Sequence, residues 1–165
     1  MKKRKPLPQF SPMLETAIDS FVERTRGLLG RIDVEGTRFE ELMARTDAHF
    51  LGGNLLPMLS HNLLRLAREQ TLEAIATIRK GSPSDVVDEV DFYASTLAEL
   101  VALVRLLSAV ELGEQPALAN EWESLADDLL ARAQQLQQAC ETLEDELEAS
   151  EPEEPSSGGG LVQIQ

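Results

Sequence analysis

The sequence predicts an all-α protein: an antiparallel helical bundle with four walls, built from about five helices and followed by a disordered acidic C-terminal tail. Hydrophobic residues make up 42% of the 165 residues but aromatic residues only 4%. The core must therefore consist of Leu, Val, Ile and Ala, the mixture that packs helix against helix. Apolar residues also recur every three or four positions over long segments, and no strand-like alternation of comparable length competes with them. A chain of this length is expected to form one domain with a continuous core.

The first helix is expected to begin at Ser11, which can act as its N-cap, with Pro12 at the first helical position. It is expected to end near Gly30, because glycine weakens a helix. A capping-box pattern at residues 37–40 then predicts a short second helix, which the glycine pair at residues 52–53 closes.

A third helix is expected from Asn54 to the Lys-Gly pair at residues 80–81, since Pro57 falls within its first turn, where no intrahelical N–H is required. A second capping box at residues 82–85 opens the fourth helix. Its apolar residues alternate in steps of three and four, the spacing that interlocking helices need; they are Val86, Val90, Tyr93, Leu97, Leu100, Val104 and Leu107. Four further residues widen this seam and predict a deeply buried helix: Val101, Leu103, Leu106 and Val110.

The fifth helix carries the most regular signal in the chain. It is expected to start at Pro116, after a break at Gly113, and to run to about Ala149. Its seam consists of Leu118, Trp122, Leu125, Leu129, Ala133, Leu136, Cys140, Leu143 and Leu147. Short connections make helices three to five antiparallel neighbours, and the first two helices together supply the fourth wall.

Three regions follow from this pattern. Residues 1–10 form a basic N-terminal arm, residues 11–149 the helical bundle, and residues 150–165 an acidic Pro/Gly/Ser linker that ends in an apolar peptide. The linker is too polar to bury the surface that folding requires, so disorder is expected there.

Negative charge is concentrated in the second half of the chain. The net charge is −14, yet residues 1–84 hold 13 basic and 10 acidic residues, whereas from residue 85 onward only Arg105 and Arg132 oppose 19 acidic ones. Such a field keeps a protein soluble, repels nucleic acid and attracts basic partners. A solvated helical surface without a binding role is the alternative interpretation.

No pattern of catalytic, cofactor or metal-binding residues rises above background. One grouping resembles a metal cluster: Glu40, Glu41, Asp47, His49 and His61. Di-metal helical bundles place a Glu three residues before a His, and neither His has one. The grouping is therefore interpreted as the edge of the core. Cys140 cannot form an internal disulfide and is expected to be a core thiol. The longest apolar run, residues 100–110, is too short to span a bilayer, so we expect a cytoplasmic protein without a membrane partner, metal or cofactor.

Two terminal segments are the candidate partner-binding residues. The basic arm can contact an acidic protein surface or phosphates, and in an extended C-terminal peptide the apolar side chains can insert into a groove or add to a sheet edge. These residues are Lys2, Lys3, Arg4 and Lys5 in the arm, and Leu161, Val162 and Ile164 in the peptide.

The sequence therefore favours a non-enzymatic interaction protein: an adaptor, an assembly factor or a chaperone-like subunit of a larger complex. Its expected partners are proteins, including a second copy of itself, and nucleic acid is expected only through the basic arm. Two alternatives stay open. One is an acidic mimic of nucleic acid that inhibits a DNA- or RNA-binding protein, and the other is a bundle cargo that its C-terminal peptide tethers to a protein shell.

Overall fold

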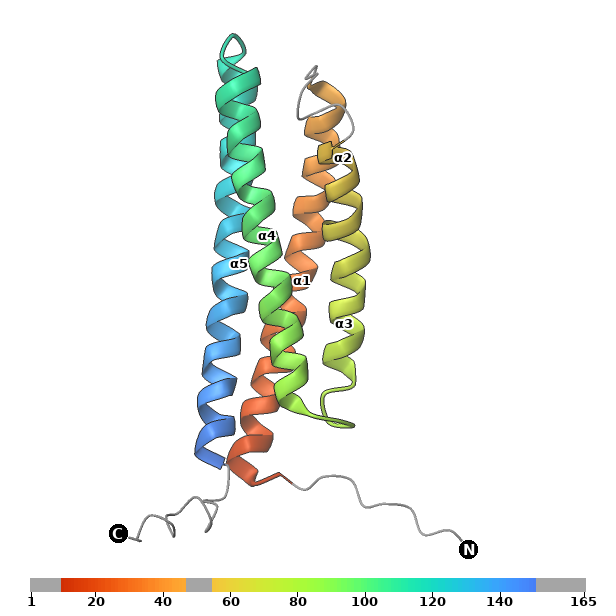
Figure 1. Ribbon diagram of the computed structural model, residues 1–165, viewed down its shortest axis with the longest axis vertical. Helices are drawn as coiled ribbons and strands as arrows, with labels where there is room; N and C mark the ends of the chain where they lie inside the picture. The colour runs from red at the N-terminus through yellow and green to blue at the C-terminus, as the bar shows by residue number, and fades with distance from the viewer. Residues whose placement is uncertain (1–9, 47–54, 151–165) are drawn as a thin grey trace, which may run out of the picture.

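The protein is all-α, as predicted (Figure 1). The computed structural model describes residues 10–46 and 55–150, and these contain no strand. Three long helices are α1 (Pro12–Arg45), α4 (Pro83–Glu111) and α5 (Pro116–Ser150). Three shorter helical pieces follow one another without a break and are called the third wall: α2 (Leu55–Ser60), the π-helix η1 (His61–Ala67) and α3 (Arg68–Ala76).

The four helical rods lie side by side along one axis (Figure 1). α5 packs against both α4 and α1, and the third wall packs against both α1 and α4. The backbones of α1 and α4 do not approach each other closely, so these two helices lie across the bundle from each other. The walls therefore form a closed ring in which each rod touches two neighbours.

The predicted break between the first two helices is wrong, because α1 runs continuously to Arg45. Gly27 and Gly30 lie on its exposed side, where each costs about 1 kcal/mol relative to Ala. The neighbouring Leu28 and Leu29 are buried, and each contributes about 1.5–3 kcal/mol. Packing thus outweighs helix propensity. Thr37, the expected N-cap, lies inside the helix, and its hydroxyl donates to the Asp33 carbonyl at 3.4 Å.

Several helix ends lie where the sequence places them. Ser11 caps α1 by accepting a hydrogen bond from the Leu14 N–H at 3.1 Å, and α5 begins at Pro116 and ends at Ser150, one residue beyond the expected position. Ser82 precedes α4 without a side-chain capping bond, so the capping box predicted there is absent. α3 ends at Ala76 rather than near residue 80. The expected ends at residues 52–54 lie outside the described residues.

The core follows the predicted seams. Every predicted seam residue of α4 and all of those in α5 up to Leu143 are buried, whereas Leu147 is partly buried. Trp122 lies edge-on against Phe39, with ring centroids 5.1 Å apart, and its indole N–H donates to the Thr46 hydroxyl at 2.9 Å. The predicted widening of the α4 seam is wrong at Leu106 and Val110, which are exposed.

Among the described helices, α4 is the one long and apolar enough to cross a membrane by length and composition. In this bundle 44% of its most apolar window is buried. A core helix of a soluble protein passes the same test, so this finding is weak evidence for a membrane span.

Candidate functional site

Ion pairs join three of the four seams between neighbouring walls. Along α1 and α5, Arg38 pairs with Asp128 at 2.6 Å and Glu35 with Arg132 at 3.1 Å. Arg45 and Glu121 form a third pair between these two helices. Arg65–Glu40 and Arg68–Asp33 join the third wall to α1, and Arg79, three residues after α3, pairs with Glu15 and Asp19 of α1. Arg105 of α4 pairs with Glu123 and Asp127 of α5. Between residues 83–110 of α4 and residues 55–76 of the third wall, the structure shows no ion pair.

A hydrogen bond from Tyr93 links these two walls. Its buried hydroxyl donates to the Leu63 carbonyl in η1 at 2.9 Å. Burial raises the pKa of Tyr93 above its usual value, so the phenol stays a neutral donor. Two other η1 carbonyls also accept side-chain hydrogen bonds, Leu64 from Arg68 and Ala67 from Thr71. Side chains that donate into the helical ladder are a recognised cause of local distortion, and π-turns occur often at functional sites.

Gly36 fixes the opposite side of η1. A Cβ atom at this buried position would lie 3.3 Å from the Cβ of Leu64, so glycine permits α1 and η1 to approach closely. One side of η1 therefore packs against α1, and the other side of η1 faces α4.

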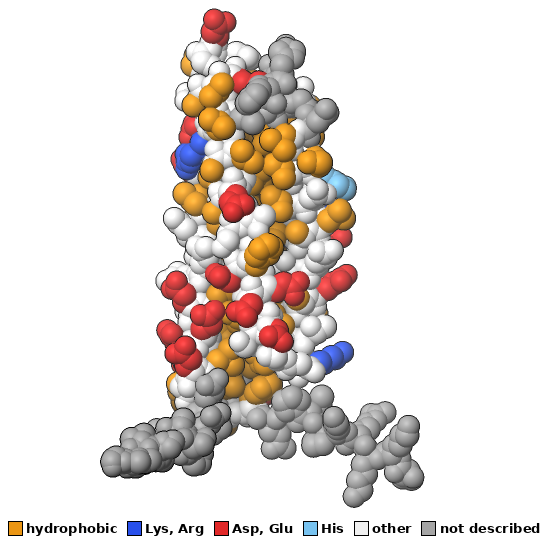
Figure 2. All heavy atoms as spheres, in the orientation of Figure 1, with side chains coloured by type: hydrophobic (Ala, Val, Ile, Leu, Met, Phe, Trp, Pro, Cys, Tyr) orange, Lys and Arg blue, Asp and Glu red, His pale blue; other side chains and the backbone are white. Residues whose placement is uncertain are grey.

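Exposed hydrophobic side chains gather on α4 and the third wall. Phe92 is the most exposed, at 74%, and it borders a groove of about 230 Å³ together with Leu63, Ala67 and Tyr93. Figure 2 shows hydrophobic side chains over the upper half of the face that these two walls form. Of the eight large hydrophobic residues exposed in the described chain, six come from α4 and the third wall, and we call them the apolar face: Leu55, Met58, Leu66, Phe92, Leu106 and Val110.

Acidic side chains occupy the lower half of the same face (Figure 2). They come from the first three turns of α4 and from α3, and we call them the acidic belt: Asp85, Asp88, Glu89, Asp91, Glu69 and Glu73. The belt continues toward the end of α5, where slight desolvation and then the charges of Asp91 and Asp88 raise the pKa of the exposed Glu144. A carboxylate whose charge is opposed by its neighbours gains from a nearby cation. The belt thus favours a positively charged partner.

The candidate residues from the sequence fall mostly elsewhere. All seven partner-binding candidates, residues 2–5 and Leu161, Val162 and Ile164, lie outside the described residues, as do Asp47 and His49. Glu40 pairs with Arg65, and His61 is exposed at the start of η1. In residues 10–46 and 55–150 no three acidic, His or Cys side chains are placed to hold a metal ion.

Cys140 is a core thiol, as expected. Its sulfur donates to the Val87 carbonyl at 3.6 Å, and burial, together with the nearby acidic groups, raises its pKa to about 12. The thiolate that nucleophilic or redox chemistry requires is therefore disfavoured.

The apolar face itself was not predicted. One signal was available, because Phe92 falls between the seam positions 90 and 93 of α4 and so interrupts an otherwise polar stripe. Compared with family models, curated proteins and solved structures, the chain shows no match. The fold and the face define a helical bundle with one apolar, acid-flanked surface.

Proposed function

We propose that this protein is a non-enzymatic interaction protein, an adaptor or assembly factor, that binds a basic amphipathic helix of a partner protein on the apolar face. The observation that carries the proposal is a coincidence of three features on one pair of walls. No ion pair joins the residues of α4 and the third wall compared above. These two walls carry six exposed hydrophobic residues, and acidic side chains occupy the lower half of the face that they form.

Helix-in-groove recognition requires an apolar strip that accepts side chains at three- and four-residue spacing. Leu106 and Val110 on α4 have that spacing, and Leu55 and Met58 provide it on α2. A partner helix with basic residues at one end would place them over the acidic belt. Charge would then set the direction of the partner helix and speed its association, while apolar burial would supply most of the affinity.

A synthetic peptide tests this mode of binding without knowledge of the natural partner. The probe is a fluorescent 18-residue peptide of Leu and Lys with all Leu on one helical face, and fluorescence anisotropy measures its affinity for the full chain. Burying a Phe side chain contributes about 1.5–3 kcal/mol, and 1.4 kcal/mol corresponds to about tenfold in Kd. Phe92→Ser should therefore weaken binding at least tenfold.

Valine provides a matched pair for the same assay. Val110 is 61% exposed on the apolar face, and Val34 is 64% exposed on α1, across the bundle from α4. Val110→Ser should weaken binding severalfold, whereas Val34→Ser should leave it unchanged. Equal binding by wild type, Phe92→Ser and Val110→Ser would overturn the proposed face.

The acidic belt also favours a second candidate, an acidic mimic of nucleic acid. Such a protein binds through charge alone, so a peptide with every Leu replaced by Ser should bind as well as the Leu/Lys probe. The double variant Asp88→Asn with Asp91→Asn should then abolish binding of both peptides, whereas Phe92→Ser should leave their binding unchanged. The two peptides thus separate the two functions.

A further inference from the structure

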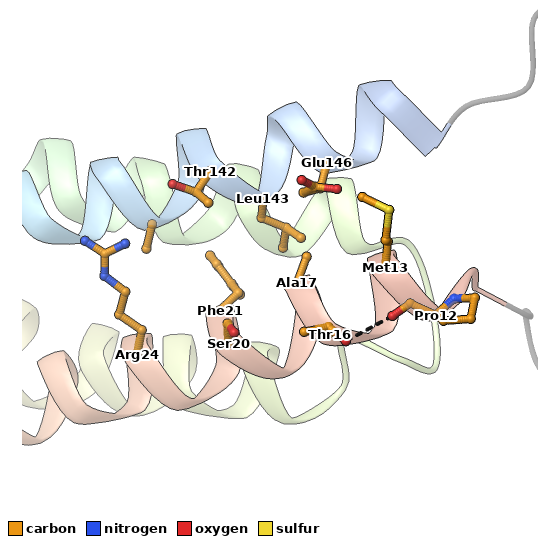
Figure 3. Close-up of a pocket in the computed structure, with 11 residues that line it drawn as sticks. Pro12, Met13, Thr16, Ala17, Ser20, Phe21, Arg24, Thr142, Leu143 and Glu146 are labelled. Atoms are coloured by element: carbon orange, nitrogen blue, oxygen red, sulfur yellow. Dashed lines mark hydrogen bonds between the residues drawn. The ribbon is translucent and has the colours of Figure 1, made fainter.

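A groove of about 540 Å³ lies between the first half of α1 and the last part of α5 (Figure 3). It belongs to the α1–α5 seam and is separate from the apolar face. Phe21 and Leu143 are buried at its floor, and Ala17 points between the two helices beside them (Figure 3). Exposed Met13 forms a wall at one end. The floor is thus entirely aliphatic or aromatic.

The groove has polar edges and different ends. Three hydroxyl side chains, Thr16, Ser20 and Thr142, are among its lining residues. Glu146 lies at the end near Met13, and Arg24 lies at the other end, where its guanidinium donates to the Gln138 side chain at 3.1 Å. A narrow apolar floor with hydroxyl groups at its edges suits a short extended peptide with aliphatic side chains better than a charged ligand.

We propose that this groove binds the chain's own C-terminal apolar peptide, folded back from the end of α5, through Leu161, Val162 and Ile164. In an extended peptide alternate side chains share a side, so Val162 and Ile164 would face the floor together. The three side chains are aliphatic, like the surface that they would cover.

The length of the intervening chain supports docking within one molecule. At 1.5 Å per residue, Glu146 lies about 6 Å and Ala139 about 17 Å before the end of α5 at Ser150. Residues 151–160 separate Ser150 from the peptide. Glu/Pro sequences such as residues 151–155 favour an extended chain of about 3.1 Å per residue, and Ser/Gly sequences such as residues 156–160 form flexible coils, so a linker of this composition has a root-mean-square span of about 20 Å. Effective concentration is highest when linker span and site distance match, and for short linkers it reaches the millimolar range.

Disulfide trapping in the full chain tests the proposal. Thr142→Cys places a thiol in the groove, and Val162→Cys places one in the peptide. The matched control is Glu141→Cys with Val162→Cys, because Glu141 is exposed, adjacent in α5 and outside the groove. Native Cys140 stays out of the reaction, since it is buried and its pKa is about 12. Under mild oxidation, the Thr142 pair should form a cross-linked monomer at least ten times faster than the Glu141 pair.

Leu161→Ser with Ile164→Ser, added to both Cys pairs, shows whether the apolar side chains cause the preference. The two pairs should then cross-link at similar rates. Equal rates in the unsubstituted peptide, or a preference that survives the Ser substitutions, would overturn docking in this groove. A disulfide-linked dimer in place of the cross-linked monomer would overturn docking within one molecule and assign the groove to a second copy. Each outcome is independent of the apolar face, which lies on other walls.

Discussion

Removing the positive partner of a buried carboxylate is expected to destabilise the bundle strongly. Glu35 is 4% exposed, and its Oε1 accepts a hydrogen bond from Arg132 at 3.1 Å, whereas its Oε2 is buried without a partner. Arg132→Met leaves this charge unpaired, which costs about 3–5 kcal/mol for a fully buried pair. The Arg132 side chain is 19% exposed, so the lower end applies.

Urea denaturation followed by circular dichroism measures the change, with thermal unfolding as a second readout. A loss of about 3 kcal/mol corresponds to a melting temperature about 6–12 °C lower in a chain of this size. Arg38→Met is the matched control, because the Arg38–Asp128 pair is 38% and 45% exposed and surface pairs contribute about 0–1 kcal/mol. Combining Glu35→Leu with Arg132→Met should restore most of the stability, since both charges are then gone.

The pH dependence provides an independent check. Burial raises the pKa of Glu35, and Arg132 opposes that shift. An acid with a raised folded-state pKa stabilises the fold as the pH falls through that pKa, because it becomes neutral there. The loss caused by Arg132→Met should therefore shrink as the pH falls from 7 toward the ordinary Glu value of about 4.3. A stability within 1 kcal/mol of wild type at pH 7, or a loss independent of pH, would refute the reasoning.

Three further predictions concern the fold and the assembly. Leu129→Asp places an unpaired charge at a fully buried position and should cost several kcal/mol, so an unchanged melting temperature would mean that this seam is exposed. Gly27→Ala should stabilise the bundle by up to about 1 kcal/mol, because open space surrounds Gly27. Gly36→Ala should give a clearly lower stability than Gly27→Ala, because the new methyl group would meet Leu64; equal stabilities would contradict the close approach of α1 and η1. Self-association is expected in light scattering, with a dimer that dissociates as salt rises if residues 2–5 form the contact; a monomeric mass at low and moderate salt would exclude it.

Most of the core was predictable because its signal lies within single helices. The seams of α4 and α5 depend on spacing alone, and the Ser11 cap depends on residues within one turn. The continuity of α1 was not predictable in the same way, since it depends on how strongly Leu28 and Leu29 pack against distant residues. Local propensity favoured a break, and tertiary burial reversed it.

The candidate site depended on information that spacing does not contain. Periodicity indicates that Leu106 and Val110 are apolar, but it does not indicate whether a neighbouring wall covers them. The π-helix η1 likewise contacts Tyr93 of α4 and Gly36 of α1, and its own sequence does not contain these contacts. The separation of the terminal segments from the bundle, like their role, stays a prediction.

The uneven distribution of ion pairs gives the ring of walls one seam along which it can open. If α4 separated from the third wall, the rods would still be connected in the order third wall, α1, α5 and α4, and none of the ion pairs described above would break. Between residues 83–110 of α4 and residues 55–76 of the third wall, the Tyr93 hydrogen bond and apolar contacts oppose this motion. Native-state hydrogen exchange should therefore reveal a low-energy opening in α2, η1 and α3, well below global unfolding, while amides in the centre of α5 exchange only when the whole protein unfolds.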